Sequence, residues 1–239
     1  MFAISNNDKK ECYWCGAPAT SKEHIPPKCL FPEEKDIGKI YNSNFRKDLI
    51  TVPSCDEHNN QKSGDDEILC ACLSCVFGAN GIAYIHSHTK LSRAFSRNPN
   101  LITSSFKILK EDTIKIEEHS FPVAIAEVNN IKMLRAFEGI ARGLYLHEFG
   151  ERFIGKCTVI PDFVKYRERD PKRELLAGLM KIVLNQEQSN WVIKGANKEI
   201  FTYQFGPVDE YQLRPMLMTF YKTLRVLVAY APVGNKFPF

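Results

Sequence analysis

Two pairs of metal-binding residues near the N-terminus restrict the fold of this chain more than any other feature. Two residues separate Cys12 from Cys15, and two separate Cys55 from His58. Thiolate and imidazole are the usual ligands of structural zinc, and two such pairs can close one tetrahedral site. The 39 residues between Cys15 and Cys55 exceed the interval of a DNA-reading zinc finger. We therefore expect the site to hold a functional loop or hairpin between the pairs.

The composition is that of an ordinary globular protein, with 44% hydrophobic and 25% charged residues among 239. No apolar run approaches the roughly 18 residues of a membrane span. The first ten residues lack the apolar core of a signal peptide, so we expect a cytoplasmic protein. In that reducing compartment the other cysteines are expected to be thiols packed in the interior. They are Cys29, Cys70, Cys72, Cys75 and Cys157.

The net charge of +4 is distributed unevenly along the sequence. Residues 1–63 carry nine basic and nine acidic side chains, whereas residues 121–239 carry seventeen basic and twelve acidic ones. The densest basic segment is Lys165–Arg173. It could contact a phosphate backbone, or it could be a solvated loop and helix start, since acids are interspersed in it.

The pattern of the sequence predicts two domains of a mixed α+β protein. Residues 1–77 are rich in Cys, Pro and turn residues and need a metal to fold firmly. In this part we expect a strand at 49–52, ended by Pro53, and a helix from His58 or Asn59 to about Phe77. Residues 78–239 form the second domain, whose role the sequence leaves open between target, DNA and partner recognition.

In the second domain the clearest helix is predicted at 130–149, where an apolar stripe recurs at helical spacing and Gly150 follows. Alternating apolar residues predict a hairpin within 105–117, and Asp170-Pro171 begins a further helix. From Trp191 onward, aromatic and β-branched residues predict a C-terminal antiparallel sheet. His86 and His88 are interpreted as exposed loop histidines without a role.

Glu23-His24-Ile25-Pro26-Pro27 supplies residues that could carry chemistry. The prolines restrict the residues before them and hold His24 at the end of an extended segment. A neutral imidazole there can accept a proton from water as the water attacks phosphorus. The Glu23 carboxylate and the Asn59 amide oxygen could bind one hard divalent cation, which would neutralise charge on the scissile phosphate.

The order of these motifs resembles the zinc-containing branch of the HNH endonucleases, over residues 12 to about 68 only. The resemblance implies a zinc-stapled ββα-metal module, in which a hairpin with the catalytic histidine packs on a helix. It implies that His24 is the general base, that Glu23 and Asn59 hold Mg²⁺ or Mn²⁺, and that Lys62 faces phosphate. Asp48 stands where the family often has the asparagine that orients the base.

The expected protein is thus a metal-dependent HNH endonuclease that hydrolyses phosphodiester bonds of DNA, or of RNA as an alternative substrate. Phage defence or mobile-element biology would suit such an enzyme, and a homodimer or a regulatory partner would be compatible with it. Three alternatives stay open. Asn42 or Asn44 could orient the base in place of Asp48, and His58 could be catalytic rather than a zinc ligand. The module could also be a non-catalytic zinc unit that binds nucleic acid or protein.

Overall fold

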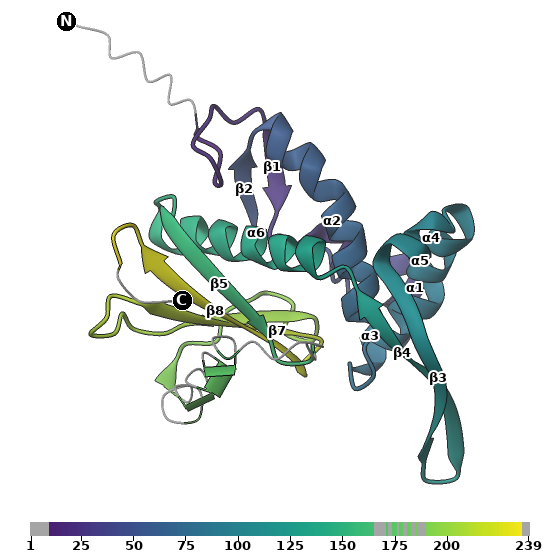
Figure 1. Cartoon of the computed structure of the whole chain (residues 1–239). Coiled ribbons are helices and arrows are strands. Elements are labelled where there is room, and N and C mark those ends of the chain that lie inside the picture. The colour runs from purple at the N-terminus through teal and green to yellow at the C-terminus, as the bar shows by residue number, and fades with distance from the viewer. Residues whose placement is uncertain are drawn as a thin grey trace, which may run out of the picture.

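A computed structural model describes residues 10–164 and 190–235, together with scattered positions between 171 and 185. The side chains of residues 60–63 are also outside this description. Apart from Pro171, the basic segment Lys165–Arg173 lies outside the described residues, as do several positions of the helix expected from Asp170, whose described positions are helical. The described residues form a mixed α+β structure in which all the paired strands are antiparallel (Figure 1).

The N-terminal part is a two-stranded hairpin followed by a long helix. Strand β1 (Ser21–His24) pairs with β2 (Thr51–Ser54), so that Glu23 lies opposite Val52 and His24 opposite Thr51. The intervening loop contains the short 3-10 helix η1 (Lys28–Leu30) and the helix α1 (Glu34–Tyr41). Helix α2 (Asp56–Cys75) begins directly after β2 and packs on β1.

The prediction that Pro53 ends the strand is wrong, because Pro53 lies inside β2 and pairs with Lys22. Its carbonyl accepts a hydrogen bond from the Tyr13 N–H at 2.9 Å. In an antiparallel strand, the backbone nitrogen and carbonyl of one residue point to the same side. Because the Pro53 carbonyl faces Tyr13, the Pro53 nitrogen also points away from β1. The missing N–H of proline therefore removes no bond from the ladder.

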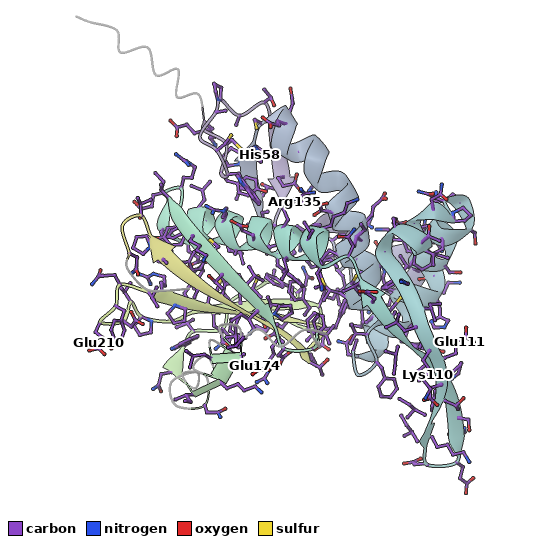
Figure 2. The ribbon with its side chains drawn as sticks, viewed as in Figure 1. His58, Lys110, Glu111, Arg135, Glu174 and Glu210 are labelled. Carbon is purple, nitrogen blue, oxygen red and sulfur yellow. The ribbon has the colours of Figure 1, made fainter. Side chains whose placement is uncertain are left out.

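Helix α2 starts two or three residues earlier than expected, and its acidic first turn, Asp56 and Glu57, suits the positive end of a helix dipole. Its second half is buried from Ile68 to Ser74, so Cys70 and Cys72 are packed in the interior as predicted, whereas Cys75 is exposed. Near its middle, the Asp65 carboxylate accepts two hydrogen bonds from the Arg135 guanidinium, at 2.5 and 2.8 Å. Arg135 is labelled in Figure 2 on the helix that packs against α2.

Four short helical segments follow α2: α3 (Gly81–His86), the π-helical turn η2 (Ser87–Leu91), α4 (Ser92–Arg97) and α5 (Asn100–Ser105). The interpretation of His86 as an exposed loop residue is wrong, since His86 is helical and fully buried. The apolar pattern around His86 is too short to predict which face of a helix is buried. His86 is buried because α3 packs against α2.

A long hairpin of β3 (Phe106–Ile116) and β4 (His119–Val128) extends away from the rest of the molecule (Figure 1). Most of its side chains are exposed, including Lys110 and Glu111, which are labelled in Figure 2. The expected hairpin within 105–117 is wrong in extent. That stretch forms only the first strand of the hairpin. Its apolar and polar side chains alternate between the two faces of the strand.

Helix α6 (Asn130–Phe149) has the predicted bounds and ends at Gly150, which adopts a left-handed φ of 73°. It lies across one face of a four-stranded sheet with the order β5-β8-β7-β6 (Figure 1). The hydroxyl of Tyr230 anchors the sheet to the helix by donating to the Ala141 carbonyl at 2.7 Å. The strands are β5 (Gly155–Pro161), β6 (Phe201–Phe205), β7 (Arg214–Phe220) and β8 (Leu224–Pro232).

The opposite side of α6 meets the N-terminal part. A Cβ at Gly143 would lie 2.6 Å from a side-chain carbon of Ile25, so only glycine allows this close approach. The Tyr221 hydroxyl, beyond β7, donates to the Leu30 carbonyl at 2.8 Å. One hydrophobic core thus runs through both predicted domains, and the division at residue 77 stays a prediction.

The structure confirms the predicted C-terminal antiparallel sheet from Phe201 onward, and aromatic side chains of β6 are buried. Phe201 and Tyr203 are each 3% exposed and belong to the core. Trp191-Val192-Ile193 is not a strand, although the adjacent Lys194 forms an isolated bridge with Tyr203. Among the described residues, no helix has the length and apolar character that crossing a bilayer requires.

Candidate metal centre

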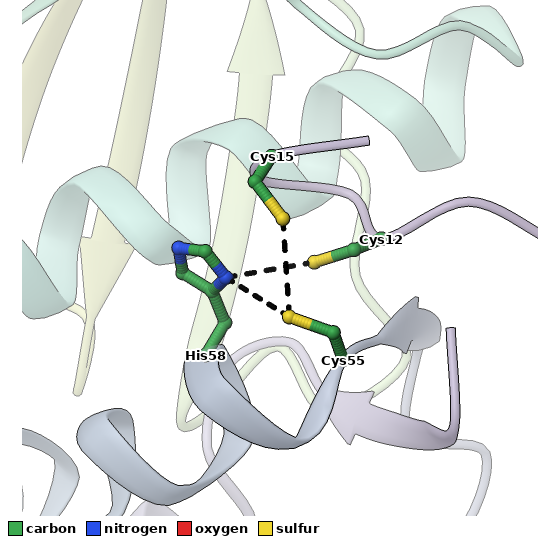
Figure 3. A group of neighbouring side chains, drawn as sticks. All are labelled: Cys12, Cys15, Cys55 and His58. Atoms are coloured by element: carbon green, nitrogen blue, oxygen red, sulfur yellow. Dashed lines mark hydrogen bonds between the residues drawn. The ribbon is translucent and has the colours of Figure 1, made fainter. Parts of the chain in front are cut away.

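The four predicted zinc ligands come together at the N-terminal end of α2 (Figure 3). Cys12 and Cys15 belong to a tight turn, closed by hydrogen bonds from the Cys12 N–H to the Ala17 carbonyl and from the Gly16 N–H to the Cys12 carbonyl. Cys55 directly precedes α2, and His58 lies in its first turn. The four ligand atoms all lie within 4.8 Å of one another.

The distances fit a tetrahedral zinc ion. A zinc–sulfur bond of about 2.3 Å places two thiolates of a tetrahedron about 3.8 Å apart. The Sγ atoms of Cys15 and Cys55 are 3.8 Å apart, and Cys12 Sγ is 3.9 Å from His58 Nδ1. Cys55 Sγ and His58 Nδ1 are closer, at 3.1 Å. Three thiols and one imidazole nitrogen are the donor set of a structural zinc site, so this cluster could hold zinc.

The chain around the cluster also favours a metal centre. Burial opposes ionisation of the Cys12 thiol, but hydrogen bonds from the backbone at Cys15, Cys55 and Trp14 outweigh it and lower the pKa of Cys12. A lowered pKa favours the thiolate, which is the form that binds metal. The turn that carries Cys12 therefore supplies part of the electrostatics of the site.

An aromatic and cationic stack connects the centre to the C-terminal sheet. The Trp14 indole stacks on the His58 ring, with centroids 5.5 Å apart and planes inclined by 21°. The Arg142 guanidinium carbon lies 5.5 Å from the centroid of the Trp14 ring. Arg142 is held in place because it donates to the Gly155 carbonyl at 2.9 Å. With zinc bound, three thiolates would leave a net negative charge near this guanidinium, which is itself paired with the Glu138 carboxylate at 2.8 Å.

The hairpin residues with proposed chemical roles divide between the two faces of β1. Ser21 and Glu23 lie on the inner face, which α2 covers, and the Asn59 side chain donates to Ser21 Oγ at 3.1 Å. Glu23 is only 8% exposed. The predicted pair Glu23 and Asn59 is thus placed on the shared surface between hairpin and helix.

His24 closes β1 and is half-buried, and the pleat of the strand directs it to the face opposite Glu23. Asp48 is exposed in the turn before β2, with a left-handed φ of 56°. Of the alternatives to Asp48, Asn42 caps α1 and the Asn44 side chain accepts from the Arg46 N–H at 2.9 Å. The side chain of Lys62 lies outside the described residues.

Asp66 is a further carboxylate near this surface that the sequence interpretation did not include. It lies seven residues after Asn59, about two helical turns, and therefore on the same face of α2. Burial, together with the charges of Glu23 and Asp66, raises the pKa of Tyr13 well above its usual range. Both carboxylates therefore act electrostatically on the buried Tyr13 hydroxyl. The helical spacing from Asn59 was the signal that could have identified Asp66.

Comparison with known proteins adds no relative. No family model, no curated protein and no solved structure matches this chain. The features that bear on function are therefore the cluster of Cys12, Cys15, Cys55 and His58 and the hairpin and helix that it joins.

Proposed function

We propose that this protein is a metal-dependent endonuclease of the HNH type, whose N-terminal module is stabilised by zinc. The observation that supports the proposal is the hairpin–helix unit joined by the four-ligand cluster. In that unit Glu23 of β1 and Asn59 of α2 occupy the same interface. A carboxylate and an amide oxygen are ligands that hard divalent cations accept.

In this proposal each residue has one task. His24 accepts the proton of the attacking water, and Glu23 and Asn59 hold the divalent cation. When bound, that cation supplies charge neutralisation at the scissile phosphate and the leaving oxygen. Asp48 would orient the base, and Lys62 would contact a phosphate oxygen. The products are 5′-phosphate and 3′-hydroxyl ends.

Incubation of the zinc-loaded protein with supercoiled plasmid tests the proposal. Nicking or linearisation is expected with added Mg²⁺ or Mn²⁺, and an intact plasmid without them. Glu23→Gln and Asn59→Ala should increase the Mn²⁺ concentration at which cleavage is half-maximal, because each removes one cation ligand. Ligation of the cleaved ends without prior phosphatase or kinase treatment would confirm their chemistry. A plasmid that stays intact at every metal concentration would refute the proposal.

A second candidate is a non-catalytic zinc module that binds nucleic acid or protein. Two observations favour it: Glu23 is almost fully buried, and strand alternation places His24 on the other face of the hairpin. The balanced charge of residues 1–63 points the same way, because tight non-specific DNA binding usually needs a basic surface. This candidate predicts zinc binding without metal-dependent cleavage in the plasmid experiment.

A further inference from the structure

The hairpin of β3 and β4 extends away from the other described elements as a ribbon of two strands (Figure 1). Most side chains on both of its faces are exposed, including the apolar ones of Ile116, Phe121 and Ile125, at 47%, 40% and 57%. A ribbon of two strands is only marginally stable in water, whereas three or more strands form a stable sheet. The addition of strands at one edge would therefore stabilise this hairpin.

The hydrogen bonds of the hairpin show which backbone groups of β4 point outward. The Asn129 N–H, directly after β4, donates to the Ser105 carbonyl at 3.3 Å, so odd-numbered residues of β4 turn their backbone groups toward β3. The one register shift in this hairpin is an extra residue in β3, so the alternation along β4 is unbroken. Even-numbered residues of β4 therefore direct their backbone groups to the outer edge, and Pro122 is one of them.

The two edges of the ribbon are consequently not equivalent. The outer edge of β4 contains Pro122, which has no N–H to offer to a further strand. On β3, the residues that lie opposite outward-facing residues of β4 are Glu111, Thr113 and Lys115. Their N–H and C=O groups point away from β4, because directly opposite residues of an antiparallel pair are either both turned inward or both turned outward. Within the described residues, β3 pairs with no strand other than β4, so its outer edge is open.

We propose that this edge of β3 binds β3 of a second copy of the chain, antiparallel and around a two-fold axis at Thr113. In this register Thr113 lies opposite Thr113 of the second copy, and Glu111 of each copy lies opposite Lys115 of the other. The outward-facing residues then form three hydrogen-bonded pairs, each of which can exchange two N–H···O bonds. Both copies use the same surface, as an isologous two-fold interface requires.

The charges along the edge favour a second copy as the occupant. Residues four apart on one strand are separated by about 13 Å, so Glu111 and Lys115 of one chain are too far apart to pair with each other. The two-fold axis brings them together as two cross-strand pairs of opposite charge, which stabilise a sheet. The residues of β4 opposite them, Ala124 and Ser120, have small side chains, so both charged groups stay available at the edge.

Like charges disfavour the neighbouring registers. A shift of two residues in one direction would place Asp112 opposite Asp112 of the second copy, and a shift in the other direction would bring Glu111 against Glu117 in the turn. Like charges that lie directly opposite each other destabilise a sheet. In the proposed register Asp112 faces Ile114 of the second copy and keeps the ion pair with Lys110 of its own chain, at 2.5 Å.

Nucleic acid is a less suitable occupant of this ribbon. Residues 106–128 contain five acidic and three basic side chains, whereas a phosphate backbone requires a positive surface. Lys110 and Glu111 lie on the part of the hairpin that extends beyond the other elements (Figure 2), so two ribbons can approach each other. A dimer would present two N-terminal modules to one duplex. That consequence rests on the proposed function, whereas the dimer itself can be measured without any cleavage.

Sedimentation velocity of the full-length, zinc-loaded protein between about 1 and 300 µM tests the dimer, because a short strand pairing belongs to the small, weak class of interfaces. The average mass should increase with concentration from one chain toward two. Thr113→Pro removes the N–H at the two-fold axis and should raise the dissociation constant by about tenfold or more. Ala124→Pro is the matched control, because it places proline at an outward-facing position of the other edge and should leave the constant unchanged. Zinc content and circular dichroism should match the wild type in both variants.

Charge variants test the register. Glu111→Lys and Lys115→Glu each create two like-charge pairs in the dimer, and each alone should raise the dissociation constant by about tenfold. An equimolar mixture of the two variants should dimerise as the wild type does, since every contact between unlike chains again joins opposite charges. Thr113→Cys should cross-link to itself under mild oxidation, because Cα atoms of a hydrogen-bonded pair lie about 5.5 Å apart, within disulfide range. Ala124→Cys should show only the background of the wild type.

The proposal is overturned if the protein stays monomeric over the whole concentration range, or if Thr113→Pro and Ala124→Pro weaken the dimer equally. A mixture of the two charge variants that dimerises as weakly as either one alone would overturn the register. An intact plasmid in the cleavage experiment leaves these outcomes unchanged, so failure of the dimer and failure of the proposed function are distinguishable.

Discussion

The ion pair between α2 and α6 allows a prediction in which the two partners are not equivalent. The Asp65 side chain is 4% exposed, whereas the Arg135 side chain is 47% exposed. Replacing Arg135 by Met leaves a nearly buried carboxylate without its two charged donors, which costs about 3–5 kcal/mol. Replacing Asp65 by Asn leaves a half-exposed guanidinium that water can solvate, so the cost is about 1 kcal/mol.

Equilibrium unfolding in urea, at a fixed and saturating zinc concentration, measures this difference. With a slope of about 3 kcal/mol/M, Arg135→Met should lower the midpoint by about 1–1.7 M and Asp65→Asn by about 0.3 M. The double variant should be more stable than Arg135→Met alone, because it no longer buries an unpaired charge. Equal losses for the two single variants, or a larger loss for Asp65→Asn, would refute this reasoning.

Three further predictions concern the zinc ligands, the contact between α6 and Ile25, and the Glu148 carboxylate. Cys55→Ser, just before α2, should lose about one equivalent of zinc per chain and unfold the hairpin, while Cys75→Ser, at the far end of α2, should retain it; metal analysis and circular dichroism distinguish them. Gly143→Ala, where a Cβ would lie 2.6 Å from a buried isoleucine carbon, should cost about 1–3 kcal/mol. Gly64→Ala, with open space around it, should instead stabilise α2 by about 0.5–1 kcal/mol; urea midpoints that rank these two variants the other way would contradict the packing. Glu148→Gln should destabilise the protein at neutral pH, and its difference from wild type should shrink as the pH falls below the ordinary value of 4.5.

The sign of the Glu148 prediction follows from its partners. Burial opposes ionisation of this carboxyl, but hydrogen bonds from Lys194 and from the Tyr203 hydroxyl, the latter at 2.6 Å, outweigh it and lower the pKa. A lowered folded-state pKa stabilises the fold above the unfolded value, and this stabilisation is lost on acidification. A pH-independent difference between the two proteins would show that the hydrogen bonds do not favour the charged form.

Local signals in the sequence were sufficient for part of this structure. The paired ligand spacings predicted the Cys12, Cys15, Cys55 and His58 cluster, because chelation by neighbouring residues is a short-range property. The helical stripe and Gly150 likewise predicted α6 with its observed bounds. Both features depend on residues within a few positions of one another.

The features that were missed depend on contacts between distant segments. Pro53 fits inside β2 only because its backbone faces the turn at Tyr13 rather than β1. His86 is buried because η1 and α2, far away in the sequence, close over it. The cation-binding surface was predicted from Glu23 and Asn59, and its position between β1 and α2 depends on the packing of the helix on the hairpin.

The most direct test of the central claim compares the rates of Mg²⁺-dependent plasmid cleavage by wild-type protein, His24→Ala and His88→Ala. His88 is exposed on η2, so its loss should leave the rate unchanged. Loss of a general base should lower the rate by about 10²–10⁴-fold, while zinc content and unfolding midpoint stay at wild-type values. Cleavage by His24→Ala at the wild-type rate would contradict the assignment of His24 as the base of a nuclease centre.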